Sequence, residues 1–227
     1  MSTKNKLHHF AENLTFDNLF QLRYEEVILG FLFAGKWASG FFNNNHDIIL
    51  ELGCGKGEYT VGLAKMHPDK NFIGADIKGA RLWRGLKTTR EENIKNAAFI
   101  RTRINLIEYY FNSEEISEIW ITFPDPHARE VSERKRLTSP QFINYYRKIL
   151  KPGGIIHLKT DNIILLEYTL DVIRDHGHEL IEVNYDVYAG GIDNELTQIQ
   201  TYYEKMWLKH GTKIKYLKFR LNPILLP

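Results

Sequence analysis

The order of apolar and polar positions along the chain predicts short strands that alternate with helices. Strand-like apolar runs occupy Asp47 to Leu52, Asn71 to Asp76, Ala98 to Thr102, Glu118 to Phe123 and Ile155 to Lys159. Helical spacing follows from Glu58 to about Met66, from Gly79 to about Asn96, and from Ser139 to near Leu150. Strands connected in this way are expected to form a mostly parallel sheet, with helices on both faces.

The two ends of the chain depart from this alternation. Residues 1–22 are polar and are predicted to form a flexible segment, and residues 23–227 a single domain that begins with a short helix from Tyr24 to Phe33. Near the other end, Thr201 to Leu208 and Lys213 to Leu221 are predicted to be two strands around His210-Gly211. Such a hairpin would add antiparallel strands to the edge of the sheet.

Composition narrows the class of protein. A chain of 227 residues with 43% apolar residues is long enough for one sizeable core. The single cysteine, Cys54, excludes an internal disulfide framework and a cysteine metal site. No apolar run approaches the ~20 residues that cross a bilayer, and no apolar stretch follows the first residues. These facts predict a soluble cytoplasmic protein without a metal site or a membrane partner, and they leave monomer and homodimer equally open.

Charge suggests a partner only through its distribution, because the net charge is +2. One basic group lies in the middle of the chain and a second follows Glu204, after which no acidic residue occurs. The members are Arg129, Arg134, Lys135 and Arg136 in the first group, and Lys205, Lys209, Lys213, Lys215, Lys218 and Arg220 in the second. Such groups favour a polyanionic partner, although a solvated surface would have the same pattern.

A glycine-rich loop follows the first predicted strand, in the sequence Glu51-Leu52-Gly53-Cys54-Gly55-Lys56-Gly57. Glycines between a strand and a helix let a ligand lie against the backbone, near the amides of the helix N-terminus. Asp76 ends the next strand, where a carboxylate can accept hydrogen bonds from both ribose hydroxyls of a nucleoside. The loop lacks the G-x-G-x-x-G spacing of nicotinamide dinucleotide sites, and Glu51 suits a ligand with a cationic amino group.

This loop, with Asp76 after it, resembles the first two motifs of class I S-adenosylmethionine-dependent methyltransferases. The resemblance implies a Rossmann-like, mostly parallel seven-stranded sheet with one antiparallel strand. It also implies that Glu51 lies near the methionine moiety of the cofactor, that Gly53 and Gly55 line the site, and that Asp76 holds the ribose.

A second segment, Phe123-Pro124-Asp125-Pro126, presents a carboxylate at the end of the fourth predicted strand. The two prolines restrict the backbone, so the side chain of Asp125 is expected to point in a fixed direction. Taken alone, this segment is better interpreted as a rigid turn with a solvated aspartate. Next to a cofactor loop, it becomes a candidate for the reacting centre.

Several segments in matching order, from about Asp47 to Arg220, resemble the bacterial tRNA (guanine-N7)-methyltransferases. They are Phe123 to Pro126, Arg129, Glu133 to Leu137, Leu150 to Gly154, Lys159 to Asp161, and Thr201 to Glu204. The resemblance implies methyl transfer from S-adenosylmethionine to guanine N7 of tRNA, at position 46 of the variable loop. It implies cofactor contacts at Glu51, Asp76, Asn105 and Asp125, and substrate contacts at Arg129, Asp161, Thr201, Tyr202, Tyr203 and Glu204.

Three positions depart from the family pattern. Asn105 stands where aspartate is usual, and an amide can still form hydrogen bonds with adenine. His127 stands where tryptophan is common, and Arg129 where lysine is common, which keeps the charge but changes its geometry.

The chemistry implied for this site needs little proton transfer. Guanine N7 carries a lone pair on the major-groove edge, so methylation requires alignment more than a base. Because the product base is cationic, nearby carboxylates such as Asp125 can stabilise the transition state. Two alternatives remain at this point: a methyltransferase for another RNA, a protein or a small molecule, and a non-catalytic RNA-binding module. The second should lack a usable Glu51, Asp76 and Asp125, and all three are present.

Overall fold

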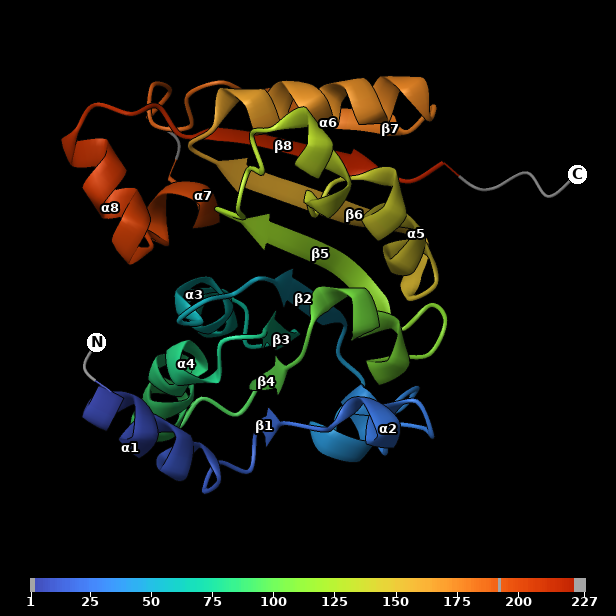
Figure 1. Ribbon diagram of the computed structural model, residues 1–227, viewed down its shortest axis with the longest axis vertical. Coiled ribbons are helices and arrows are strands. Elements are labelled where there is room, and N and C mark those ends of the chain that lie inside the picture. The colour runs from blue at the N-terminus through green and yellow to red at the C-terminus, as the bar shows by residue number, and fades with distance from the viewer. Residues whose placement is uncertain (1–2, 192, 223–227) are drawn as a thin grey trace, which may run out of the picture. The chain divides into compact units, whose positions relative to one another are not determined.

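The computed structural model describes residues 3–191 and 193–222. The chain divides into two compact units, Met1–Asn112 and Ser113–Pro227. Each unit contains four of the eight strands in the described part of the chain, and Figure 1 labels these strands and the helices that connect them.

Unit 1 contains four parallel strands that hydrogen-bond in the order β1-β4-β3-β2. Their bounds are Leu19–Phe20 for β1, Ile48–Leu52 for β2, Asn71–Asp76 for β3 and Ala97–Arg101 for β4. Every residue of β2 and β3 is buried, as expected for parallel strands covered on both faces. The carboxyl ends of β2 and β3 therefore lie together, which brings Gly53, directly after β2, close to Asp76, the last residue of β3.

Helices α3 (Glu58–Met66) and α4 (Gly79–Glu91) connect these strands. Two further short elements, α2 (Tyr24–Val27) and a π-helix (Trp37–Phe41), precede β2, and a 3-10 helix, η2 (Ile104–Tyr110), follows β4. Phe99 packs closely against two glycines: a Cβ atom at Gly57 or Gly85 would lie 2.6 or 2.7 Å from its ring. The glycine loop is thereby packed directly against β4 and α4.

The N-terminal segment forms helix α1 (Thr3–Asn13), which packs against α4 (Figure 1). The His9 ring stacks on Trp83, with the ring centres 3.8 Å apart and an angle of 5° between the ring planes. Trp83 also donates a hydrogen bond of 2.6 Å to Glu12. Asn13 Nδ2 donates to the carbonyl of Gly79 at 2.8 Å. The expectation that residues 1–22 are flexible in solution stays a prediction, and residues 1 and 2 lie outside the described range.

Unit 2 contains four strands that hydrogen-bond in the order β5-β6-β8-β7. Their bounds are Ile116–Thr122 for β5, Leu150–Thr160 for β6, Glu179–Asn184 for β7 and Lys215–Arg220 for β8. Strands β5 and β6 are parallel, whereas β8 is antiparallel to both β6 and β7. The helices of this unit are η3 (Glu130–Lys135), α5 (Pro140–Arg147), α6 (Ile163–Asp175), α7 (Glu195–Gln198) and α8 (Tyr202–Lys209).

The mostly parallel arrangement with one reversed strand is confirmed. Apart from the two-residue strand β1, the described residues form seven strands, the number that the family resemblance implies. Two expected elements are shorter: α4 ends at Glu91, before Asn93 with its φ of 55°, and α2 ends at Val27. Residues Lys151 to Gly154 form a bulge within β6, since Leu150 pairs with Ile116 but Ile155 pairs with Glu118.

One prediction about the C-terminal region was wrong. Thr201 to Leu208 is not a strand, because residues from Tyr202 form helix α8. Thr201 and Glu204 form a capping box: Thr201 Oγ1 accepts from the amide of Glu204 at 3.2 Å, and Glu204 Oε2 accepts from the amide of Thr201 at 3.3 Å. The antiparallel partner of β8 in the expected hairpin is instead β7.

The described chain has no helix long and apolar enough to span a membrane. It also has no group of three or more histidine, cysteine, aspartate or glutamate side chains arranged to hold a metal ion.

The buried His157 of β6 makes the stability of the fold depend on pH. Its ring stacks on Trp120, with the ring centres 4.0 Å apart and an angle of 4° between the ring planes. Its Nδ1 lies 2.7 Å from Tyr216 Oη. Burial lowers the pKa of His157, and the Glu118 carboxylate, 3.2 Å from Nε2, opposes this effect only in part. The unfolded chain therefore binds a proton that the folded chain does not, below the ordinary histidine pKa of about 6.5.

We accordingly expect the free energy of unfolding to fall as the pH decreases below about 6.5, with a share from His157 of at most about 1.4 kcal/mol per pH unit. Urea denaturation at several pH values measures this slope. His157→Phe should flatten it, whereas the control His8→Gln, at a side chain that is 71% exposed, should not. Equal slopes in the wild type and His157→Phe would contradict the assignment.

Candidate active site: a cofactor half in unit 1 and a substrate half in unit 2

In unit 1, the glycine loop adopts a backbone that only glycine takes readily. The φ angles of Gly53, Gly55 and Gly57 are 72°, 58° and 70°. The amides of Gly53 and Cys54 both donate to the carbonyl of Ala75, at 2.8 and 3.1 Å, which ties the loop to the end of β3. A Cβ atom placed on Gly55 would meet nothing closer than 4.0 Å, so the loop presents an open backbone surface there.

The carboxylate of Asp76 lies against this loop. Its Oδ2 accepts a hydrogen bond of 2.9 Å from the amide of Gly55, and its Oδ1 accepts one of 2.7 Å from the amide of Lys78. The residue is 8% exposed. The two backbone bonds fix the direction of the carboxylate and leave lone pairs for further donors, as binding of a ribose diol requires.

Glu51 is also buried, at 3% exposed, and one of its oxygens accepts from the α3 N-terminus. Glu51 Oε2 accepts a 2.8 Å hydrogen bond from the amide of Thr60 and a second, short one from the Thr60 hydroxyl. Burial, Glu51 and Asp76 together raise the pKa of the Cys54 thiol well above its usual range. A thiol held protonated in this way is not a nucleophile.

Asn105 lies on η2 and is exposed. It lines a hollow of unit 1 together with Ile77, Thr102 and Leu106, to which Arg101 and Arg103 also contribute. Apolar side chains and an amide in one hollow suit a purine ring. The residues of unit 1 therefore fit an adenosyl ligand: an open glycine loop, a ribose acceptor at Asp76, and a hollow beside it.

In unit 2, the segment from Phe123 to His127 forms a strained loop. Phe123 and His127 have φ angles of 48° and 41°, which residues other than glycine rarely adopt and which cost about 1–3 kcal/mol each. Asp125 lies between them with its side chain 75% exposed, and its Oδ1 accepts a 3.0 Å hydrogen bond from the amide of His127. The carboxylate is thus presented outward in a fixed direction, as the two prolines predicted.

Arg136 holds this loop in place. Its Nε donates to the carbonyl of Pro126 at 3.0 Å, and its Nη2 donates to the carbonyl of His127 at 3.2 Å. Its Nη1 lies 2.9 Å from Glu133, and its guanidinium lies 4.2 Å from the centre of the Tyr168 ring. The residue is 1% exposed, so the expectation that Arg136 belongs to a basic surface for RNA was wrong. Arg129, Arg134 and Lys135 are exposed.

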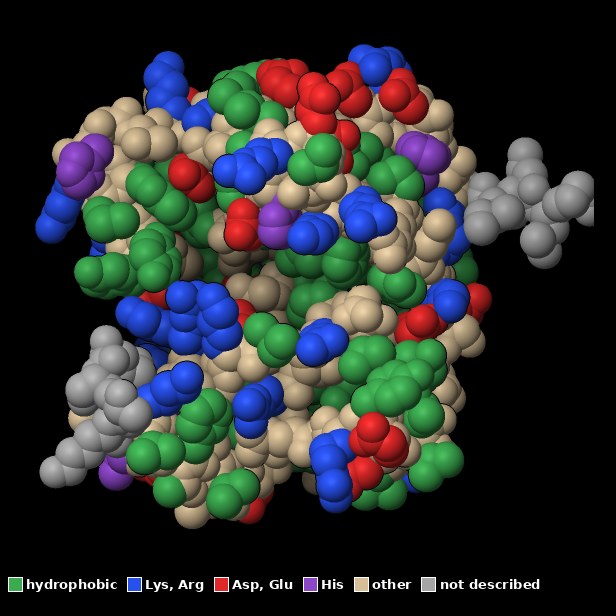
Figure 2. Space-filling model, viewed as in Figure 1, with side chains coloured by type: hydrophobic (Ala, Val, Ile, Leu, Met, Phe, Trp, Pro, Cys, Tyr) green, Lys and Arg blue, Asp and Glu red, His purple; other side chains and the backbone are tan. Residues whose placement is uncertain are grey.

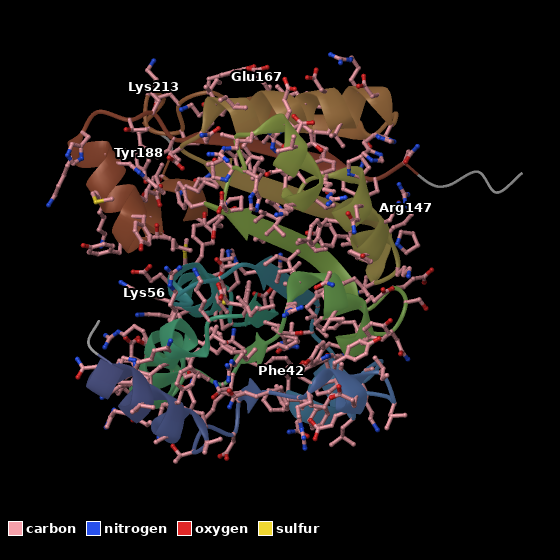
Figure 3. The ribbon with its side chains drawn as sticks, in the orientation of Figure 1. Phe42, Lys56, Arg147, Glu167, Tyr188 and Lys213 are labelled. Carbon is pink, nitrogen blue, oxygen red and sulfur yellow. The ribbon has the colours of Figure 1, made fainter. Side chains whose placement is uncertain are left out.

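Glu204 is buried within unit 2, where the sequence predicted a substrate contact. Its side chain and that of Lys159 are both 0% exposed, with Lys159 Nζ 2.6 Å from Glu204 Oε1. Tyr188 (labelled in Figure 3) donates a 2.9 Å hydrogen bond to the same oxygen. In this structure the carboxylate is engaged inside the protein, which explains why the pKa of Tyr188 is raised, by burial first and by Glu204 second. A direct contact of Glu204 with guanine is not supported by this geometry.

Other predicted substrate residues lie at or near the surface of unit 2. Tyr202 and Tyr203 are 56% and 43% exposed, and their rings meet edge to face at 5.5 Å. Asp161 is half-buried at the end of β6, and burial raises the pKa of its carboxyl. Both tyrosines are exposed because they follow the turn of a helix and not the alternation of a strand, which would have buried one of the two.

Similar folds occur among solved structures of methyltransferases. The 16S rRNA methyltransferase KamB aligns with 83% of this chain and 94% of its own, with a TM-score of 0.63 and 13% sequence identity. A variant of the 16S rRNA (adenine(1408)-N(1))-methyltransferase of Catenulisporales acidiphilia, solved with cosubstrate SAM, aligns with 91% of this chain and 94% of its own, at a TM-score of 0.55 and 12% identity. The fold and the glycine loop with its carboxylates define a class I methyltransferase.

Relatives in sequence define the family more narrowly. A family described as putative methyltransferase matches residues 45–217. A tRNA (guanine-N(7)-)-methyltransferase of Christiangramia forsetii is 51% identical over 98% of this chain and 100% of its own length. One of Bacteroides thetaiotaomicron is 48% identical over 96% of this chain and 86% of its own. The chain belongs to the tRNA (guanine-N7)-methyltransferase family, and the family resemblance inferred from its motifs is confirmed.

Proposed function

We propose that this protein transfers a methyl group from S-adenosylmethionine to N7 of a guanine in tRNA, at position 46 of the variable loop. The observation that carries the proposal is 51% identity to a tRNA (guanine-N(7)-)-methyltransferase over nearly the whole of both chains. The structure supports it at the cofactor half, where Asp76 is hydrogen-bonded to the loop at Gly55. S-adenosylmethionine supplies the methyl group, carried on a sulfonium that leaves as a neutral thioether.

The residues of unit 1 bind and orient the cofactor in this proposal. Asp76 accepts hydrogen bonds from the ribose hydroxyls, Asn105 bonds to adenine, and Gly53 and Gly55 let the ligand lie against the loop. Glu51 acts through the α3 N-terminus, which its carboxylate already fixes, and through its negative charge near the cationic amino group of the methionine moiety.

The residues of unit 2 bind the acceptor. Guanine N7 attacks with its own lone pair, so no side chain has to remove a proton. Asp125 is the catalytic residue: its outward carboxylate stabilises the positive charge that develops on the base. Arg129, Asp161 and the exposed Tyr202 and Tyr203 contact the tRNA, with Thr201 placing the two tyrosines as the N-cap of α8.

The direct test is methyl transfer from labelled S-adenosylmethionine to unmodified tRNA, followed by mapping of the label. We expect label at N7 of guanine 46 and none in a tRNA with adenine at that position. Asp76→Ala is the control for the cofactor half, and it should weaken cofactor binding by about 10- to 100-fold because a charged hydrogen-bond acceptor is lost. Label at another nucleotide would revise the substrate, and absence of transfer to any RNA by a cofactor-binding protein would overturn the proposal.

A further inference from the structure

Helix α4 carries a row of basic side chains that the active site as described does not use. Lys78, Arg81 and Arg84 follow one another at intervals of three residues, which places them in a slanting row along one side of the helix. Lys78 and Arg84 are exposed and Arg81 is half-buried. Figure 2 shows lysine and arginine side chains gathered on the drawn face of unit 1 over α3 and α4, near Lys56, which Figure 3 labels.

These three cations have no acidic partner among the residues that the structure describes. Other cations of α4 differ in this respect. Lys87 lies 3.9 Å from Glu91 and 4.9 Å from the Trp83 ring centre, and the Arg90 guanidinium packs on Phe16 at 3.8 Å. A row of unneutralised cations raises the local positive potential and costs stability through mutual repulsion. A polyanionic partner would remove this repulsion.

The row begins beside the cofactor half of the site. Lys78 comes two residues after Asp76, and its amide donates to the Asp76 carboxylate. The opposite side of α4 is held by α1 through the stacked rings of His9 and Trp83. The helix is therefore fixed in its rotation. The row starts at the carboxyl-end edge of the strands, where ligands of such sheets bind, and runs along the first half of α4.

We propose that Lys78, Arg81 and Arg84 form a docking surface for the phosphate backbone of tRNA, in addition to Arg129, Arg134 and Lys135 of unit 2. The proposal rests on the proposed function, since tRNA is the polyanion that the enzyme must hold while a guanine reaches the methyl group. Guanidinium groups bind phosphate through paired hydrogen bonds, and lysine binds it as a point charge. The contacts are made to the backbone, so they position the tRNA without reading its sequence.

The test compares two triple variants of the full-length protein with the same change in net charge. The first is Lys78→Gln/Arg81→Gln/Arg84→Gln. The control is Lys65→Gln/Lys70→Gln/Lys95→Gln, whose positions lie at or near the amino ends of β3 and β4, the opposite edge of the unit 1 strands. Lys65 is paired with Glu92 on the exposed surface, a contact that contributes little to stability.

The dissociation constant for unmodified tRNA is measured against salt concentration, together with cofactor affinity and kcat at saturating tRNA. We expect the first variant to bind tRNA about 10- to 100-fold more weakly at low salt, and to lower the slope of log K against log salt by about 2 to 3, or roughly 0.7 to 0.9 for each phosphate contact. Its cofactor affinity and kcat should stay within about twofold of the wild type, and the control should retain the wild-type slope.

An unchanged slope in the first variant, or an equal loss in the control, would overturn the docking surface while leaving the methyltransferase function intact. Failure of the wild-type protein to bind or methylate tRNA would overturn the proposed function and this surface with it. The two failures are distinguishable because the wild-type assay is read first.

Discussion

Lys159→Met is expected to lower the free energy of unfolding by about 3–5 kcal/mol. The lysine and Glu204 are both 0% exposed, and methionine would leave the Glu204 carboxylate buried without its cation. Lys159 Nζ also donates to the carbonyl of Leu196 at 2.6 Å and lies 3.4 Å from that of Ile199. One ammonium group thus ties β6 to the end of α7 and to α8, so its loss affects both the charge balance and the placement of these helices.

Urea denaturation measures this change, and two variants separate its causes. In Lys159→Met/Glu204→Gln the uncompensated charge is absent, and a large part of the lost stability should return. The control is Arg174→Met, which breaks the exposed pairs with Asp171 and Asp175 and should cost less than about 1 kcal/mol. A loss of that small size in Lys159→Met would show that the pair adds little to the fold.

The cofactor half of the site could be predicted from sequence because its signals are local. The loop from Gly53 to Gly57 and the carboxylate of Asp76 lie at the ends of adjacent, fully buried strands, and these strands have apolar runs that are easy to recognise. The predicted bounds of β3 and α3 agree with the structure, Asn71–Asp76 and Glu58–Met66. In a parallel sheet, such bounds already place Gly53 beside Asp76.

The substrate half was predicted less well because its charged residues are buried by distant partners. Arg136 and Glu204 belong to residue types that are mostly exposed, and no local pattern marks either of them as buried. Lys159, the partner of Glu204, is 45 positions earlier in the chain, and Arg136 donates to two backbone carbonyls as well as to its neighbour Glu133. No pattern of side-chain types reveals a bond to a carbonyl.

Helix α8 is different, since its sequence contained a usable signal. Thr201-Tyr202-Tyr203-Glu204 has the T-x-x-E spacing of a capping box, and the structure shows both of its hydrogen bonds. The apolar and aromatic residues that follow suit a strand as well as a short helix, so the alternation favoured the wrong element. The T-x-x-E spacing by itself predicts a helix with Tyr202 and Tyr203 in its first turn, as the structure shows.

Arg136→Met is expected to lower kcat by about 100-fold while leaving tRNA affinity and its salt dependence close to those of the wild type. The reason is that the guanidinium fixes the carbonyls of Pro126 and His127, the two residues that follow Asp125 in the strained loop. Without it, the loop can relax toward ordinary φ values, and a displacement of about 1 Å at a reacting centre costs on the order of 100-fold in rate. Arg136 is therefore a positioning residue and does not touch the substrate.

Three comparisons distinguish positioning from general loss of structure or of charge. Asp125→Ala should lower kcat at least as much as Arg136→Met, and the double variant should be little worse than Asp125→Ala, because both act through the same carboxylate. Arg136→Lys keeps the charge but not the paired donors, and its kcat should be intermediate.

The exposed neighbour Arg134 gives the opposite result. Arg134→Ala should weaken tRNA binding and lower the slope of log K against log salt by about 1, with kcat retained at saturating tRNA. If Arg136→Met instead weakened tRNA binding and kept kcat, the buried guanidinium would not be what aligns Asp125.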